Sequence, residues 1–491
     1  MVASTDPTAV QPNEGSKRFA FRGHPRGLPI LFFTELWERF SYYGMRAILV
    51  LYMVTPVAQG GLGFDTKHAT SIYGTYTMSV YLTALPGGLI ADRWLGARLA
   101  VLLGGIIIAC GHFSMVFHSI AFLYLGMAFI AVGTGLLKPN ISAMVGSLYS
   151  EEDPRRDSGF SIFYMGINVG AVLAPLVCGF LAQHEGFKAF VASLGFHPAT
   201  SWHWGFGAAG VGMTLGLIIY TLNRKQLVPV AKSAKVETKD VVRGNPPLTR
   251  NDYKRIAAIF IFFLFTILFW AAYEQKGASL NLFALRLVRT ELFGFAFPSS
   301  WLQSLTPLFV ILLAPLFSML WVRLGTRQPS SPVKFVFGLL FIGLAYALLV
   351  PGAALTALGK ISPLWLVGLY FLEVVGEMCL SPVGLSTVTK LSPAKLVGIM
   401  MGVWFLAAAL GNKLAGYLSG FFVADNAGTL VRLYGGIAAG LLISAAILSL
   451  IMQRPSTSEI ISCLTAVSSA GCRATSQDFP SFSSTFPSPS S

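Results

Sequence analysis

Apolar stretches of about 20 residues recur along the chain, and short polar connections separate them. A stretch of that length forms a helix long enough to cross a bilayer. The pattern therefore predicts an all-α membrane protein with twelve transmembrane helices. These helices are expected at 29–54, 69–91, 98–118, 121–142, 159–183, 203–222, 256–276, 301–322, 333–351, 363–388, 396–421 and 431–452.

One long polar connection, 224–254, separates six predicted helices from six. Two six-helix halves joined by such a linker form the ground plan of the major facilitator superfamily, in which the halves rock about a site between them. The chain beyond the last helix is rich in Ser and Pro, which predicts disorder. The expected segments are an N-terminal segment at 1–25, six-helix bundles at 26–223 and 255–453, the linker at 224–254 and a tail at 454–491.

Composition agrees with a membrane protein, because 54% of the residues are hydrophobic and only 11% are charged, whereas soluble proteins have about 25% charged residues. The net charge of +14 is unevenly distributed. With the N-terminus inside, the connections on that side hold 23 of the 35 Lys and Arg residues, and the opposite connections hold six. This asymmetry predicts that both termini are cytoplasmic. It also assigns the basic excess to the lipid bilayer and not to nucleic acid.

The first predicted helix carries charges that hydrocarbon does not tolerate. At about 100° per residue, one face of this helix presents Glu35, Glu38, Arg39, Tyr42 and Arg46. Charged side chains inside a membrane are costly unless they pair or line a wet cavity. The pattern therefore predicts that this face lines a path for something polar.

The first predicted helix contains the string Glu35-x-x-Glu38-Arg39-Phe-x-Tyr42-Tyr43. Later predicted helices contain the strings Gly133-Thr-Gly-Leu-Leu-Lys138-Pro-Asn, Phe163-Tyr-Met-Gly-Ile-Asn168, Phe269-Trp270-Ala-Ala-Tyr-Glu274-Gln, Gly376-Glu377-Met-Cys-Leu-Ser381-Pro and Met401-Gly-Val-Trp404. Together these motifs resemble those of the proton-dependent oligopeptide transporter family, from about residue 25 to 452, and the first string is the most specific. Gly88-Leu-Ile-Ala-Asp92-Arg93, followed by Arg98, is similar to the superfamily's loop motif, in which the acid caps a neighbouring helix and the basic residues latch the inner gate.

Two departures from the family stand out. Many bacterial members have two further helices between the halves, and the linker here has no room for them. Thr306 stands where many members have an Asn that contacts peptide, which removes one expected ligand bond.

The resemblance implies a proton-coupled symporter that imports di- and tripeptides by alternating access. It implies that Glu35, Glu38 and Arg39, with Lys138 as their partner, and Glu274 couple protons to transport. Moving a cation toward or away from a buried acid changes how readily that acid ionises.

The resemblance also implies two gates between the halves and a peptide site at the centre. Arg46 with Glu274 is expected to close the outer side, and Lys138 with Glu377 the inner side. Arg46 and Lys138 are expected to bind the peptide carboxylate and Glu377 its ammonium group. The full expected binding set is Arg46, Tyr43, Tyr81, Lys138, Asn168, Trp270, Glu274, Glu377, Ser381 and Trp404.

Other functions remain open at this point. The same fold could carry nitrate, an amino acid or another organic anion, or could exchange drugs for protons. A membrane enzyme is not expected, because the helices contain no HExxH or GxSxG motif. The five cysteines show no metal or disulfide spacing, so no cofactor is predicted. We expect the protein to work as a monomer.

Overall fold

The computed structural model describes residues 21–453, apart from 22, 151, 228–248, 293 and 394–395. The predicted segments 1–25 and 454–491 and the linker at 224–254 lie largely outside the described residues, so the segment limits stay predictions. The helices of the first half are α1 (Gly27–Val54), α2 (Thr66–Leu82), α3 (Ala84–Ile90), α4 (Ala97–Ser114), α5 (Ile120–Ser147), α6 (Arg156–Gln183), α7 (Glu185–Ser193) and α8 (Ser201–Asn223). Those of the second half are α9 (Arg250–Tyr273), α10 (Ser279–Leu287), α11 (Leu305–Leu324), α12 (Ser331–Leu355), α13 (Leu364–Leu391), α14 (Val397–Ser419) and α15 (Ala427–Gln453).

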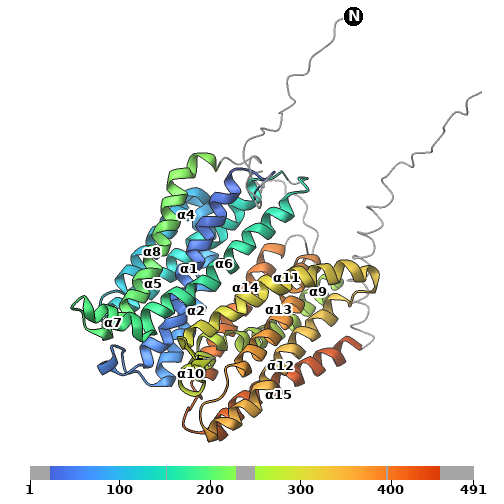
Figure 1. Cartoon of the computed structure of the whole chain (residues 1–491). Coiled ribbons are helices and arrows are strands. Elements are labelled where there is room, and N and C mark those ends of the chain that lie inside the picture. The colour runs from blue at the N-terminus through green and yellow to red at the C-terminus, as the bar shows by residue number, and fades with distance from the viewer. Residues whose placement is uncertain are drawn as a thin grey trace, which may run out of the picture.

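The predicted fold class is confirmed, with twelve membrane crossings in two six-helix halves that lie side by side (Figure 1). Ten crossings are long and apolar enough by composition alone. The other two are α1, which carries the charged stripe, and the continuous pair α2 and α3, whose first part is rich in Thr, Ser and Tyr. The polar residues of these crossings therefore mark the face toward the centre of the bundle.

Most predicted helix limits lie close to the observed ones, and two interruptions were not predicted. Pro86 lacks the N–H that would bond the carbonyl of Leu82, and the crossing divides there at Thr83. In the seventh crossing, the predicted helix 256–276 is replaced by α9, a 3₁₀ turn at Glu274–Gly277 and α10. The turn redirects the backbone at the level of Glu274.

Short elements outside the twelve crossings were also missed by the hydrophobic pattern. They are the nine-residue helix α7 and a hairpin of two-residue strands, β1 (Glu291–Leu292) and β2 (Phe295–Ala296). Both hairpin strands are exposed, so apolar periodicity could not reveal them.

Helix α1 is the centre of the first half, where it packs along α6 and α8. The close approach to α6 requires glycine at position 44, because a Cβ there would overlap the sulfur of Cys178. Almost all of α1 is consequently buried, including its charged residues. We call the side on which α1 begins the inner side and the opposite side the outer side.

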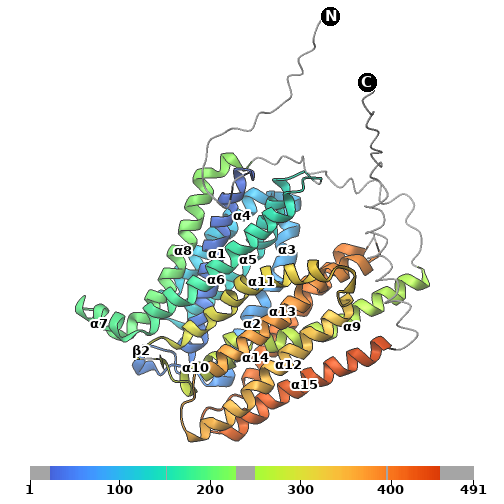
Figure 2. The ribbon, with the colours of Figure 1, turned by 45° about the vertical axis from the view of Figure 1, so that its right-hand side comes forward.

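The two halves meet on the outer side, near α10 and the outer ends of α2 and α14 (Figure 2). Gly74 of α2 faces Gly416 of α14 so closely that a Cβ on Gly416 would lie 2.6 Å from the Cα of Gly74. The side chain of Asn281, on α10, donates a hydrogen bond of 2.9 Å to the carbonyl of Ala47 on α1. These contacts close the outer side of the protein.

Candidate functional site

The charged stripe of α1 forms a buried cluster. The guanidinium of Arg39 pairs with Glu35 at 3.0 Å and with Glu38. Each of these three residues is 4% exposed or less. One cation thus faces two carboxylates, so the cluster can take up a proton and still keep an ion pair. This arrangement suits a site that binds and releases protons.

Lys138 of α5 does not join this cluster in the observed conformation. Its Nζ atom lies 4.6 Å from the centroid of the Tyr81 ring, a cation–π contact. No ion pair joins Lys138 to Glu35 or Glu38, although the lysine acts electrostatically on both. The predicted partnership therefore requires another conformation and stays a prediction.

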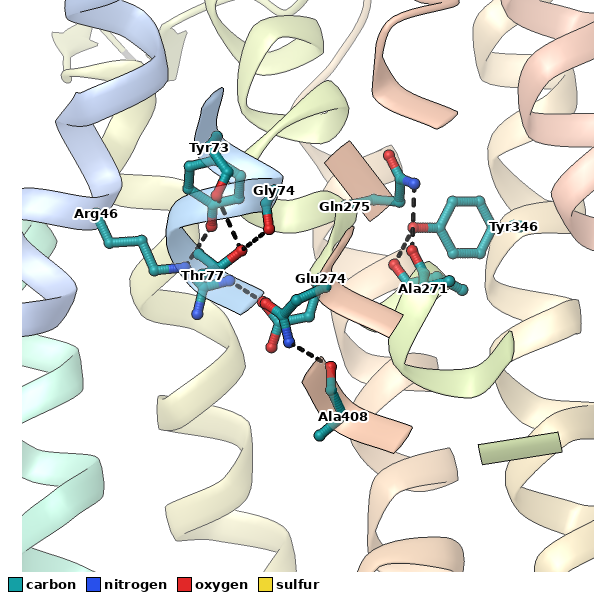
Figure 3. Close-up of polar contacts among 11 residues, drawn as sticks. Arg46, Tyr73, Gly74, Thr77, Ala271, Glu274, Gln275, Tyr346 and Ala408 are labelled. Atoms are coloured by element: carbon teal, nitrogen blue, oxygen red, sulfur yellow. Dashed lines mark hydrogen bonds and ion pairs between the residues drawn. The ribbon is translucent and has the colours of Figure 1, made fainter. Parts of the chain in front are cut away.

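The predicted outer pair is formed. Arg46 of α1 binds the carboxylate of Glu274, in the turn after α9, and its Nε donates to the hydroxyl of Tyr73 on α2 (Figure 3). Arg46 and Glu274 are 4% and 3% exposed. The bond thus connects the two halves inside the protein, as a gate on the outer side would.

The predicted inner pair is not formed. Both Lys138 and Glu377 are described, and no ion pair joins them. Glu377 of α13 instead accepts a hydrogen bond from the hydroxyl of Tyr273 on α9. Each residue of this pair is engaged within its own half, so these two residues do not join the halves in the observed conformation.

The loop motif between α3 and α4 is also disengaged. Asp92 and Arg93 are exposed in the π-helical turn Ala91–Leu95, and no hydrogen bond of Asp92 to a described residue is recorded. Arg98 donates to the carbonyl of Leu227, at the end of the same half. The expected helix cap by Asp92 is therefore absent from this conformation.

Some polar residues of the expected peptide site are only partly buried, so a ligand could reach them. Tyr43, Tyr81 and Ser381 have intermediate exposure. Tyr43 lies under the guanidinium of Arg46, whose central carbon is 5.9 Å from the ring centroid. Asn168 is 7% exposed, and its amide nitrogen donates to the carbonyl of Tyr164 at 2.9 Å, which leaves its oxygen as the acceptor for a ligand.

The two tryptophans differ in their surroundings. Trp270 is partly exposed and packs edge-to-face on Tyr273 at 5.2 Å between centroids. Trp404 is 7% exposed, and its ring fills the space that a Cβ on Gly384 would need. Trp270 can therefore offer a wall to a ligand, whereas Trp404 in this conformation is packed in the second half.

Several polar residues of the site were not found from the sequence. Tyr73 is bonded to Arg46 and Tyr273 to Glu377. Gln183 of α6 accepts hydrogen bonds from the amide and hydroxyl of Ser300 at 3.3 and 2.6 Å. A tyrosine in a membrane helix is equally common in a core or at an interface, so its identity gave no signal. Gln183 stands at the end of a predicted helix, where a polar residue is expected anyway.

Comparison with known proteins identifies the family. The model of the POT family (PTR2) matches residues 98–244 and 247–433. The chain belongs to this family. It is 43% identical over 453 residues to the uncharacterized transporter YclF of Bacillus subtilis (82% of this chain, 89% of the relative). It is 38% identical to the peptide transporter YePEPT of Yersinia enterocolitica (88% and 94%).

Solved structures of POT-family proteins agree. A crystal structure of a mutant of the peptide transporter POT in complex with alafosfalin superposes with a TM-score of 0.79 at 38% identity, covering 90% of this chain and 96% of that one. A POT family transporter in complex with 5-aminolevulinic acid gives a TM-score of 0.76 at 34% identity, over 88% and 97%. The predicted family is confirmed, and the chain is a multi-pass membrane transporter.

Proposed function

We propose that this protein is a proton-coupled symporter that imports di- and tripeptides across the cell membrane, with both termini in the cytoplasm. The observation that carries the proposal is the pair of buried charge sets along α1. Glu35, Glu38 and Arg39 form an acid-rich cluster, and two turns further along, Arg46 binds Glu274 across the halves. Named relatives, such as the di-/tripeptide transporter of Lactococcus lactis, support peptide as the substrate.

The geometry supports alternating access as the mechanism. Protonation of Glu274 would weaken its bond to Arg46 and so favour opening of the outer side. Arg46 would then be free for a peptide carboxylate, which it can bind through two parallel N–H donors. Closure of the outer side restores the bond and returns the proton to solution on the inner side. Protonation of Glu274 thus favours peptide binding at Arg46, which couples the two movements in the same direction.

The opposite end of the peptide would meet Glu377. Its carboxylate is 9% exposed and is held by the hydroxyl of Tyr273 rather than by a cation. It is therefore available to an ammonium group. A small inorganic anion would gain nothing from this acid, which favours peptide over nitrate as the cargo.

The α1 cluster would provide the proton path on the inner side. Lys138 lies on Tyr81, and Glu35 and Glu38 are close enough to act on it electrostatically. Its approach to the acids would favour their ionised forms. All these steps occur within one chain, so we propose that the monomer is the transporting unit.

Uptake of a labelled dipeptide into proteoliposomes, with and without an inward proton gradient, tests the proposal. We expect accumulation only with the gradient. Glu38→Gln should abolish that accumulation and preserve counterflow exchange of peptide, because the amide mimics a permanently protonated acid. Glu185→Gln, at an exposed carboxyl of α7, serves as the control and should behave as wild type. Gradient-independent uptake in the wild-type protein would reject proton coupling.

A further inference from the structure

A second set of buried charges lies in the second half, apart from the residues assigned above. Glu373 of α13 stands one turn before Glu377 and is 0% exposed, and no described cation is paired with its carboxyl group. Lys276, in the turn Glu274–Gly277, is 9% exposed. Its Nζ atom lies 3.3 Å from the centroid of the Tyr273 ring.

An unpaired carboxylate at the position of Glu373 is unfavourable. Burial of such a charge without a bonded partner costs several kcal/mol, much more than burial of the neutral acid. No ion pair with nitrogen and oxygen within 4 Å joins Glu373 to Lys276 or to another described residue. In this conformation, closed on the outer side, the surroundings of Glu373 therefore favour the acid with its proton bound.

The groups that face Glu373 come from several elements. They are Lys276 and Glu274 of the turn after α9, Tyr273 of α9, Tyr346 of α12, and Tyr370 and Glu377 of α13 itself. The hydroxyl of Tyr346 donates to the carbonyl of Ala272 at 2.8 Å, so toward the neighbouring Glu373 it can act only as an acceptor from the protonated acid. Figure 3 shows Tyr346 beside the turn that begins at Glu274. Within this group Lys276 is the cation, and the other ionisable members are acids or phenols.

Lys276 lies close both to the proposed outer gate and to the proposed peptide site. It is two residues from Glu274, whose carboxylate is held by Arg46. It lies on the ring of Tyr273, whose hydroxyl is bonded to Glu377. Loss of Arg46 from Glu274, or arrival of an ammonium group at Glu377, would each change the charge around Lys276.

We propose that Glu373 is a second proton-binding residue of the transport cycle, with Lys276 as its exchangeable counter-charge. The inference rests on the proposed proton symport. When the outer gate opens, Glu274 loses Arg46 and attracts Lys276, so Glu373 takes up a proton from water. The observed conformation is the next stage, in which Arg46 has recaptured Glu274 and Glu373 still holds its proton without a paired cation. As the cycle continues on the inner side, Lys276 moves to Glu373. The carboxyl O–H bond then breaks, the proton passes to water, and the ammonium group stabilises the carboxylate.

The highest ratio of inside to outside concentration that a neutral dipeptide reaches, its limiting accumulation, depends on the number of protons transported with it. In proteoliposomes with a gradient of one pH unit and the membrane potential held at zero, each coupled proton multiplies the limiting accumulation about tenfold. Glu373→Gln keeps the size of the side chain and removes its proton. We expect its limiting accumulation to be about tenfold below wild type but still above one, with counterflow exchange retained.

Lys276→Gln provides an independent test should Glu373→Gln fail to fold. Without the counter-charge, Glu373 would keep its proton throughout the cycle, so the same tenfold loss is expected. Glu291→Gln, at an exposed carboxyl of the hairpin in the same half, is the matched control and should accumulate peptide as wild type does.

The outcomes separate this inference from the proposed function. Wild-type protein that shows no gradient-driven accumulation would reject the symport and the second proton site with it. Gradient-driven accumulation in wild type with an unchanged limit in either folded variant would reject the role of Glu373 alone. Complete loss of gradient-driven accumulation in Glu373→Gln would also contradict it, because the α1 cluster should still couple a proton.

Discussion

The outer and inner sides of the interface between the two halves are built differently. On the outer side, four side chains from the second half bond backbone carbonyls of the first half; the donors are Asn281, Gln303, Trp301 and Ser304. The Arg46–Glu274 bond lies next to them. On the inner side, Lys138 and Glu377 each have a partner within their own half.

This difference shows how closure can be strong and still reversible. The neutral bonds to carbonyls define one geometry, and each contributes only about 1 kcal/mol. The buried ion pair is the element whose loss is costly, and a proton or a peptide carboxylate can compete for it. The outer side therefore has several weak contacts and one ion pair, which we propose as the switch. On the inner side, Lys138 and Glu377 are bonded only within their own halves, and we propose them as ligand groups.

The largest expected effect comes from the switchable contact. Arg46→Ala leaves Glu274 buried without its partner, at a cost of about 3–5 kcal/mol, and should shift the protein toward the outward-open state. A cysteine replacing Ser299, which is 3% exposed between the halves, in a background without other cysteines, should then react with a membrane-impermeant thiol reagent. In the parent protein it should be protected.

The exchange of the two charges sharpens this test. Arg46→Glu combined with Glu274→Arg keeps the bond but displaces the proposed carboxylate anchor. We expect protection of the cysteine to return without recovery of peptide binding. Equal reactivity in parent, single variant and exchange would show that the pair is not a gate.

The fold was largely predictable because a bilayer imposes a strict length and polarity on each crossing. The charged stripe on α1 was predictable for the same reason, since Glu35, Glu38 and Arg39 have no place in lipid. The sequence could not show which partners are engaged. Lys138 can contact either Tyr81 or an acid, and which it contacts depends on the conformation and not on the residue types.

The sequence also could not show which tyrosine hydroxyls bond the charged residues of the site. Tyr73 and Tyr273 complete the hydrogen bonding of Arg46 and Glu377, yet many tyrosines in the chain look alike by pattern. Glu373 was visible as an intramembrane acid, but its unpaired burial and its proximity to Lys276 arise from the turn at Glu274–Gly277. That turn interrupts a segment that the hydrophobic pattern predicted as one continuous helix.

The next largest effect concerns Glu377, on the inner side, which we propose as a ligand group for the peptide ammonium. Acetylation of a dipeptide removes the ammonium group that Glu377 is proposed to bind. Loss of a charge-assisted contact costs about 1.5–3 kcal/mol, or about 10- to 150-fold in affinity. Competition of free and acetylated dialanine against labelled peptide measures the difference. Equal competition would contradict the assignment of Glu377.

A smaller effect on outer closure is expected where the backbones of α2 and α14, from opposite halves, lie in close contact. A Cβ on Gly416 would lie 2.5 Å from the carbonyl oxygen of Thr70, so Gly416→Ala should disfavour outer closure by about 1–3 kcal/mol. The Ser299 cysteine should become more reactive, though less so than in Arg46→Ala. Gly436→Ala is the matched control, because a Cβ at that position has nothing within 4 Å. The same reactivity in both variants would mean that this approach does not limit closure.

The smallest effect belongs to a contact on the inner side that depends on pH. His24, just before α1, shares a hydrogen bond of 2.9 Å with the hydroxyl of Tyr149 after α5. Burial, and then the nearby Arg155, lower the pKa of His24 below its usual value. The folded state therefore favours the neutral ring, so the stability from this contact is present above about pH 6.5 and is lost as the pH falls below that value.

Replacement of this histidine separates the pH effect from the rest of the inner side. His24→Asn should increase hydrogen exchange at the start of α1 at pH 7.5 by no more than about twofold, as expected for a substitution near the surface. Between pH 7.5 and pH 5.5 the difference between the variant and the wild type should become smaller, because protonation of the wild-type ring weakens the contact. A difference that stays the same at pH 5.5 would show that the neutral ring is not what anchors this end of α1. Equal hydrogen exchange of the variant and the wild type at both pH values would show that packing alone, and not the His24–Tyr149 hydrogen bond, holds the inner end of α1.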